Sequence, residues 1–413
     1  MHVVPNRRSL LKAGIGLATV PWLASRGLGA GPPHDVTYAE DFDELWRTLG
    51  ERYCYFGEKR TDWAAVRALY RPQALAASSH DAFGEIVDRV LGELYDAHTH
   101  RGGGTDGRAR LPYYDLWVEY APAGRALVTS VRDGSAAADA GIAPGDVVTH
   151  VDGTDVGARA AALAPRCLRR PDPAATAYAL NIAVSGRRGQ PRRLELLRAD
   201  GSERSVLLPL KVAAPLPDVE SRLLPGGYGC IVIRGFSDQA VIDAFDAALL
   251  HFRDTPGLII DVRQNGGGDT AVARPIMGRF ITTTRAYARM RRRERNRLSA
   301  AWTETVDPRG PFTYIPPVVV LTTRWSASMA EGFPMGMRGI GRGTIVGTPM
   351  MRVGAAVFPL RLDRTGIDLQ YSAEPVYDVH DQPRWLLDPD IFVPTGDILA
   401  AGVRALDAAR LVR

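Results

Sequence analysis

The chain has 413 residues, of which 46% are hydrophobic and 23% charged, the composition of a globular, enzyme-sized protein rather than a disordered or fibrous one. Its formal net charge of +5 comes from scattered arginines, so the charge pattern does not indicate nucleic-acid binding. The three cysteines, Cys54, Cys167 and Cys230, lack metal-like spacing and predict neither a zinc site nor a disulfide scaffold. Beyond the N-terminal region no stretch is long and apolar enough to span a membrane, so we expect no membrane span in the mature form.

Residues 1–30 have the pattern of an export signal. Arg7 and Arg8 precede a moderately apolar run over 13–24 that ends in small residues and is too short for a membrane span. The pattern resembles a twin-arginine signal peptide, and a disordered basic tail is the alternative. We therefore expect a bacterial protein of the cell envelope (periplasmic) or a secreted one.

Residues 37–104 are expected to form an N-terminal helical segment. Apolar residues such as Phe42, Leu45 and Leu49 recur at helical spacing, and the same period returns from Phe83 to Leu94. Two or more amphipathic helices are predicted here.

A histidine pair, His98 and His100, stands where these helices give way to a polar, glycine-rich loop. Such a pair is usually solvent-facing or a weak metal site, and a catalytic role is the alternative. From these residues alone both interpretations stay open.

Residues 112–212 have a different pattern, in which short runs of alternating apolar and polar residues are separated by turns. Five runs predict strands, and a short helix is expected between Gly134 and Gly145. The stretch VRDGSAAADAGIAPGDVVTHVDGTDV is similar to the hallmark segment of PDZ domains, which capture peptides as an added strand at a sheet edge. The sequence therefore predicts a PDZ-like domain, and a PDZ that only scaffolds is the alternative.

Residues 222–413 read as an α/β domain. A helix is expected over 238–253 and a buried strand over 258–262, followed by the glycine triplet Gly266 to Gly268. Glycines at the carboxyl end of a strand allow main chain to approach a ligand closely. The loop lacks the Gly-Lys-Ser/Thr ending of a phosphate loop, and a flexible turn is the other interpretation.

A second strand-and-turn unit contains two serines. The run Val318 to Leu321 predicts a buried strand, a tight turn with Ser326 and Ser328 follows, and residues 329–337 have the composition of a short helix. A hydroxyl at such a turn faces the unpaired N–H groups of the helix. Both serines are candidates for a helix cap or for a nucleophile.

Together, DVRQNGGG, RWSASMAEG, the PDZ-like stretch and the terminal DPDIFVP resemble the tail-specific, or C-terminal processing, serine peptidases and the related core of tricorn protease. The resemblance covers about Thr37 to Pro394. It implies a Clp-protease/crotonase-like α/β core with an N-terminal helical segment and an inserted PDZ-like β domain. It also implies Ser328 as nucleophile, with main-chain amides of Met329, Gly266 and Gly267 as oxyanion donors.

The peptidases that this chain resembles fall into two branches, which differ in the residue that serves as the general base. Peptidases of the Ser–Lys type carry a lysine where this chain has Val353, and no lysine follows Lys211. The neighbouring Arg352 cannot act as a base because a guanidinium keeps its proton. The His-based, tricorn-core-like branch takes its base from a loop that matches DAHTH, which implies His98, with His100 as the fallback.

That branch also orients its histidine with a serine and a distant acid. Ala97 stands at the serine position, so Asp96 or Thr99 is the expected replacement. The downstream acids are Glu374, Asp378, Asp381 and Asp388, of which we choose Glu374.

These expectations add up to an exported serine-type endopeptidase that cleaves proteins or peptides through an acyl-enzyme, without metal or cofactor. Two alternatives belong to other classes. One is a catalytically eroded family member that binds a peptide or another ligand, and the other is a PDZ protein whose core is a scaffold. The sequence leaves the oligomeric state open.

Overall fold

The computed structural model describes residues 38–411, except 103–106, 112, 114 and 212–215. It begins with three helices, α1 (Tyr38–Arg52), α2 (Trp63–Leu75) and α3 (His80–Gly92). Their apolar stripes meet, and Phe42, Val66 and Phe83 are fully buried. Asp62 and Ser79 cap α2 and α3 by accepting from main-chain amides of the first turn. The predicted helical segment is therefore helical, and its export-signal neighbour lies outside the described residues.

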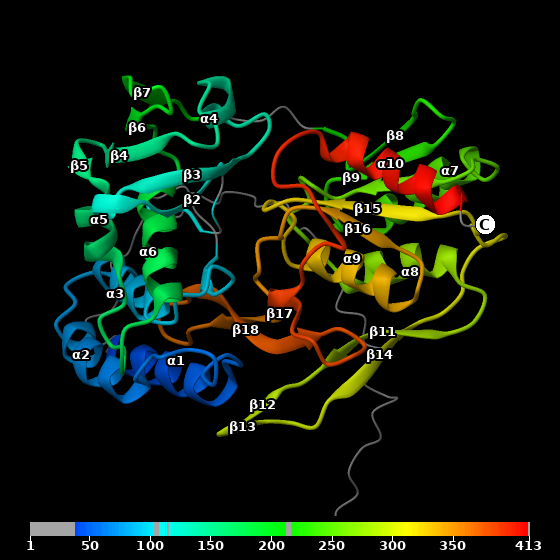
Figure 1. The fold of residues 1–413 in the computed structure, drawn as a ribbon. Coiled ribbons are helices and arrows are strands. Elements are labelled where there is room, and N and C mark those ends of the chain that lie inside the picture. The colour runs from blue at the N-terminus through cyan, green and yellow to red at the C-terminus, as the bar shows by residue number, and fades with distance from the viewer. Residues whose placement is uncertain (1–37, 103–106, 112, 114, 212–215, 412–413) are drawn as a thin grey trace, which may run out of the picture. The chain divides into compact units, whose positions relative to one another are not determined.

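The next part of the chain forms a small sheet with the strand order β2-β3-β4-β6-β7, and β5 pairs with β4 (Figure 1). Its strands are β2 (Leu116–Tyr120), β3 (Ala126–Val131), β4 (Val147–Val151), β5 (Thr154–Asp155), β6 (Arg192–Leu197) and β7 (Glu203–Leu208). Its helices are the 3-10 turn η2 (Pro122–Gly124), α4 (Ala136–Asp139), α5 (Val156–Leu163) and α6 (Pro173–Ser185). All strand pairs are antiparallel.

The C-terminal part is built on a six-stranded sheet of order β19-β16-β15-β10-β9-β8. Strands β9, β10, β15, β16 and β19 run parallel, and only β8 is antiparallel to its neighbour. The strands are β8 (Val219–Leu223), β9 (Gly229–Ile233), β10 (Leu258–Asp261), β15 (Val318–Thr322), β16 (Thr344–Gly347) and β19 (Ile391–Phe392). The helices around them are α7 (Gln239–His251), α8 (Thr270–Met277), the 3-10 turn η3 (Gly278–Phe280), α9 (Met329–Gly339) and α10 (Ile398–Leu411).

Both faces of this sheet are covered. Ile260 and Val320 pack with residues of α7, α8 and α9, whereas their neighbours Ile259 and Val319 pack with Leu406 of α10. Because side chains alternate across a strand, a strand buried on both faces must be apolar throughout. The all-buried strands β10 and β15 meet this requirement except at their last residues, Asp261 and Thr322.

A second sheet of the same domain has the order β1-β18-β11-β14, with β17 paired to β18. It consists of β1 (His100–Arg101), β11 (Arg285–Met290), β14 (Trp302–Val306), β17 (Ala355–Arg361) and β18 (Asp368–Tyr377). A hairpin of β12 (Arg293–Glu294) and β13 (Arg297–Leu298) and the 3-10 turn η4 (Arg384–Leu386) complete the elements. Strand β1 follows the histidine loop directly, so this sheet ties the loop to the peptidase-like core.

The predicted fold class is confirmed: N-terminal helices, a PDZ-like β domain and an α/β core are all present. The sequence did not predict α5 and α6. From Tyr178 to Ser185 every residue of α6 is buried, whichever face it lies on, and the exposed residues such as Thr176 all precede this run, so the usual amphipathic period is missing. None of the helices in the described ranges is long and apolar enough to cross a membrane.

Helix α9 forms although Gly332, Pro334 and Gly336 give it a poor intrinsic propensity. Packing explains the glycines. A Cβ on Gly336 would lie 2.5 Å from Met277 Sδ and 3.1 Å from Tyr287 Cδ2. Gly336 therefore lets α9 pack closely on α8 and β11, and tertiary contact overrides propensity.

We expect Gly336→Ala to lower the free energy of unfolding by about 1–3 kcal/mol, because overpacking a core costs that much and outweighs the helix preference of alanine. Denaturant unfolding checks this. Gly92→Ala is the matched control, since a Cβ there meets nothing within 4 Å and should leave stability unchanged or raise it. Equal stability of Gly336→Ala and wild type would contradict the packing explanation.

Candidate active site

Ser328 stands between β15 and α9 in a strained conformation. Its φ of 55° and ψ of −118° lie where a residue other than glycine is rarely found, and its side chain makes no capping hydrogen bond to α9. Within the described part of the chain its hydroxyl has no hydrogen-bond partner. A strained, unpaired hydroxyl at a helix N-terminus is the arrangement expected of a nucleophile rather than of a cap.

Ser326 has a different role. It is fully buried, its Oγ donates to the Val262 carbonyl at 2.8 Å, and it accepts from the Thr323 amide at 3.1 Å. Its own carbonyl accepts from the Met351 amide at 3.0 Å. Ser326 therefore holds the turn in shape, and of the two serines only Ser328 is available for chemistry.

The glycine loop lies directly against Ser328. A Cβ on Gly267 would be 2.7 Å from Ser328 Cβ and 3.1 Å from the Met329 nitrogen, and Gly267 has a φ of +111°. Only glycine satisfies both conditions. The glycine loop thus lies against Ser328 at van der Waals distance.

The oxyanion donors follow from the amides at this contact. Among the described residues, the Met329 and Gly266 amides donate to no partner. The Gly267 amide instead donates to Asn265 Oδ1 at 2.8 Å. The Gly267 amide is therefore engaged, and its role as an oxyanion donor stays a prediction, whereas Met329 and Gly266 have unused N–H groups.

Asn265 is the residue that joins these pieces. It is fully buried, and its side-chain Nδ2 donates to the Ile233 carbonyl at 3.1 Å. Its main-chain carbonyl accepts from the Ala327 amide at 3.0 Å. One side chain and its main chain therefore fix the end of β9, the glycine loop and the residue before Ser328.

The PDZ-like domain also contacts this loop. Arg132, just after β3, donates through Nε to Gln264 Oε1 at 2.9 Å and through Nη2 to the Gln264 carbonyl at 3.3 Å. Gln264 immediately precedes Asn265. The conformation of the oxyanion loop is thus braced from outside the peptidase-like domain.

His98 lies in a buried loop organised by Asp96. The Asp96 carboxylate accepts from the His98 amide at 3.0 Å, and from the Thr99 and Ser372 hydroxyls at 2.7 Å each. Gln370 donates to the His98 carbonyl at 2.9 Å. The main chain at His98 is therefore held on both sides.

The imidazole of His98 is buried, and its Nδ1 has no partner among the described residues. Burial lowers the pKa of His98 to about 4, opposed by the charge of Asp96 and the main chain of Val353 and reinforced by Arg384. His98 is therefore neutral near pH 7, the protonation state that a general base requires.

The segment 351–354 connects His98 with Ser328. Ala97, Ala327 and Val353 belong to one buried apolar cluster, and Ala97 and Ala327 are the direct neighbours of His98 and Ser328. Val353 donates its amide to Glu331 Oε1 at 2.9 Å, on the first turn of α9. The His98 loop and the turn at Ser328 therefore both pack against this short segment.

The expected acid is engaged elsewhere. The Glu374 carboxylate accepts from the Arg292 guanidinium, with Nε to Oε1 at 2.6 Å, and no hydrogen bond joins it to His98 in the described residues. The other three downstream acids also have partners: Asp378 accepts from amides of its own turn, Asp381 pairs with Arg289, and Asp388 pairs with Arg352. The role of Glu374 stays a prediction, whereas Asp96 contacts the His98 loop directly.

No lysine takes the place of the base. Val353 stands at the family lysine position and is buried in the apolar cluster. Of the lysines in the described ranges, Lys59 donates to the Tyr95 carbonyl at 3.1 Å and Lys211 pairs with Asp139. No cluster of His, Cys, Asp or Glu in these ranges could hold a metal ion.

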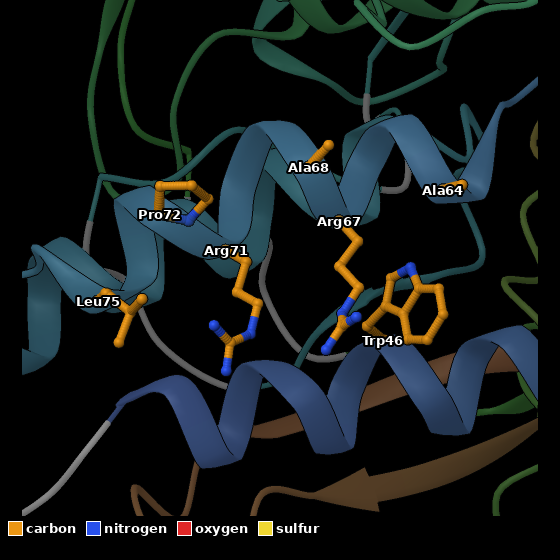
Figure 2. Close-up of a pocket in the computed structure, with 7 residues that line it drawn as sticks. All are labelled: Trp46, Ala64, Arg67, Ala68, Arg71, Pro72 and Leu75. Carbon is orange, nitrogen blue, oxygen red and sulfur yellow. The ribbon is translucent and has the colours of Figure 1, made fainter.

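Two cavities lie away from Ser328. One, of about 450 Å³, is lined by Trp46, Ala64, Arg67, Ala68, Arg71, Pro72 and Leu75 (Figure 2). Its arginines point from α2 toward α1, where both pair with Asp43, and its lining offers no nucleophile. The other, of about 960 Å³, lies between α3, α5 and α6 and is lined by Thr99 and His100 among others.

Sequence reasoning missed Asn265 and Arg132 as parts of the site. The Asn-Gly pair in DVRQNGGG is a turn signal and could have pointed to Asn265. Arg132 had no such signal, because its partner is 132 positions away in the chain.

Comparison with known proteins agrees with this geometry. Residues 227–393 match peptidase family S41, residues 34–92 match the tricorn protease C1 domain, and residues 127–164 match the PDZ domain. The chain is 29% identical over 270 residues to "putative tricorn protease homolog 2" of Streptomyces coelicolor. It is 26% identical over 233 residues to "carboxy-terminal processing protease CtpB" of Bacillus subtilis. These matches cover 57% and 54% of this chain but only 21% and 43% of the relatives.

Solved structures share the fold. Mature CPAF superposes with a TM-score of 0.61 at 17% identity, covering 91% of this chain and 97% of CPAF. The photosystem II D1 C-terminal processing protease superposes with a TM-score of 0.56 at 19% identity, covering 90% of this chain and 98% of its own. The resemblance found in the sequence is therefore confirmed: the domain that carries Ser328 and the glycine loop belongs to peptidase family S41, and tricorn C1 and PDZ domains accompany it in the same chain.

Proposed function

We propose that this protein is a serine endopeptidase whose nucleophile is Ser328 and whose base is His98. The observation that carries the proposal is the strained Ser328, with an unpaired hydroxyl beside the two unused amides of Met329 and Gly266. This combination provides a nucleophile and an anion site at one point. Membership of the core domain in peptidase family S41 supports it.

The reaction is acyl transfer. His98 takes the proton of Ser328, and Ser328 Oγ attacks a peptide carbonyl, whose oxygen becomes an oxyanion held by the Met329 and Gly266 amides. Collapse of this intermediate breaks the C–N bond, and the imidazolium gives its proton to the leaving amine. Water, deprotonated by His98, then hydrolyses the acyl-enzyme and regenerates Ser328.

Asp96 is proposed as the positioning residue for His98. Its carboxylate holds the His98 amide and two hydroxyls that surround the loop, and its charge favours the imidazolium that forms during attack. Asp96 thereby takes over the positioning role of the serine that the related branch has where this chain has Ala97.

The substrate is proposed to be a protein or peptide met outside the cytoplasm. The twin-arginine-like pattern at residues 1–30 supports export to the cell envelope or medium. The relative named as a carboxy-terminal processing protease supports peptide-bond cleavage as the reaction.

A second candidate is a peptide-binding protein with an eroded site. One observation favours it: the buried His98 Nδ1 has no acceptor partner among the described residues, so the orienting acid of a full triad is missing. Labelling the serine separates the two candidates.

We expect a fluorophosphonate probe to label the exported protein at neutral pH, and expect labelling to vanish in Ser328→Ala and in His98→Ala. The reason is that the probe reacts only with a serine whose proton has an acceptor. His150→Ala, on β4, should retain labelling. Loss of labelling in His100→Ala but not in His98→Ala would identify His100 as the base. A folded wild-type protein that is not labelled would favour the second candidate, a peptide-binding protein.

The pH dependence follows from the low pKa of His98. The base acts in its neutral form, so kcat/KM should rise as the pH increases through about 4 and stay level near neutrality, instead of rising near 6.5. Between these values the unfolded chain binds a proton that the folded one does not, so the free energy of unfolding should fall as the pH drops from about 6.5 to 4. A kcat/KM profile with its midpoint near 6.5 would contradict a buried His98.

Asp96→Ala should reduce kcat by about 10²-fold with a smaller effect on KM, because misplacing a base costs transition-state stabilisation. It should also move the acid limb of the profile to lower pH, since the Asp96 charge raises the pKa of His98. Asp378→Ala is the control, a buried acid that only accepts from its own turn. A drop in kcat without any shift of the acid limb would assign Asp96 a purely structural role.

A further inference from the structure

The edge of the PDZ-like sheet at β2 is covered by α6. Strand β2 is terminal in its sheet, and among the described residues it pairs only with β3. Peptides bind PDZ domains by adding a strand to an exposed edge, which requires unused N–H and C=O groups there. The state of these groups on β2 decides whether a peptide can add.

Asn181 of α6 uses these groups. Its Oδ1 accepts from the Val118 amide at 3.0 Å, and its Nδ2 donates to the Val118 carbonyl at 2.9 Å. Asn181 is 2% exposed and Val118 is 1% exposed. The Asn181 side chain thus makes the two hydrogen bonds that a residue of an added strand would make with Val118. It occupies the space that a peptide strand would need there.

A buried charge stands at the end of the same strand. A peptide that ran antiparallel to β2 would end near Asp115, whose carboxylate is 1% exposed and paired with Arg192 Nη2 at 2.6 Å. A second carboxylate at this point would have to compete with Asp115 for Arg192 in a region of low dielectric constant. The start of β2 is therefore unsuited to a peptide C-terminus.

Helix α6 is also held from its other side. Ala175, Tyr178 and Ile182 lie in the buried cluster that contains Trp325 and Ala327, in the turn that leads to Ser328. To expose the edge of β2 to a peptide, α6 would have to move away from β2 and disturb this cluster. The closed arrangement is thus packed against the nucleophile turn.

We infer that Asn181 makes cleavage independent of the substrate's C-terminal carboxylate. On the proposed peptidase function, the substrates are extended internal segments rather than chain ends captured by the PDZ-like domain. Asn181 is then a specificity-determining residue, because it blocks the strand edge at which a tail would be recognised.

The test compares two forms of one quenched-fluorescent peptide library, with a free C-terminal carboxylate and with a C-terminal amide. We expect the wild-type protein to cleave both with kcat/KM values within about twofold of each other, and Ser328→Ala to bind both with equal affinity. A preference of about tenfold or more for the carboxylate form, in cleavage or in binding, would overturn the inference. If neither form is cleaved, the proposed function fails, and the binding comparison with Ser328→Ala still decides the inference.

A second measurement tests whether Asn181 protects the Val118 amide. Hydrogen exchange of the Val118 amide should be at least about tenfold faster in Asn181→Ala than in wild type, and unchanged in the control Thr176→Ala on the exposed side of α6. Asn181→Ser serves in the same assay if circular dichroism shows that Asn181→Ala is unfolded. Equal exchange in wild type and a folded Asn181 variant would show that Asn181 does not occupy this edge.

Discussion

The site depends on one buried carboxylate. Glu331, on the first turn of α9, accepts from the Val353 and Gly354 amides at 2.9 and 3.1 Å and lies 3.4 Å from Arg384 Nε. Burial raises the pKa of Glu331, while Arg384 and the two amides oppose this by favouring the ionised form. The carboxylate locks segment 351–354 onto the helix that begins at Ser328, and the other side of that segment faces the His98 loop. Breaking such a pair would leave a buried charge uncompensated, at a cost of about 3–5 kcal/mol.

The PDZ-like domain is part of the same construction. Arg132 braces the glycine loop through Gln264, and Trp117 of β2 stacks with Arg324 at 4.8 Å, four residues before Ser328. Helix α6 packs between β2 and the nucleophile turn. With these contacts the domain borders the turn at Ser328, which agrees with the engagement of the β2 edge by Asn181. Its influence on chemistry would then act through the shape of the oxyanion loop.

Local signals in the sequence were sufficient for the fold class and for the strand, turn and helix around Ser328. A buried strand, a tight turn and a helix follow one another within about twenty residues, and each has its own pattern. The ion pair of Glu374 shows what the sequence could not predict. Its partner Arg292 is 82 positions away and reaches it through the pairing of β11 with β18. Asn181 gave no signal either, because only the packed fold brings it to Val118.

The central claim is that Ser328 carries a covalent acyl group during turnover, with His98 as the proton acceptor. The most direct measurement is peptide mapping by mass spectrometry after brief reaction with p-nitrophenyl acetate and acid quenching. We expect an acetyl group on Ser328, within the tryptic peptide of residues 325–338, and none on this peptide in His98→Ala. An acetyl group on Ser326, or equal acetylation of Ser328 in His98→Ala, would contradict it.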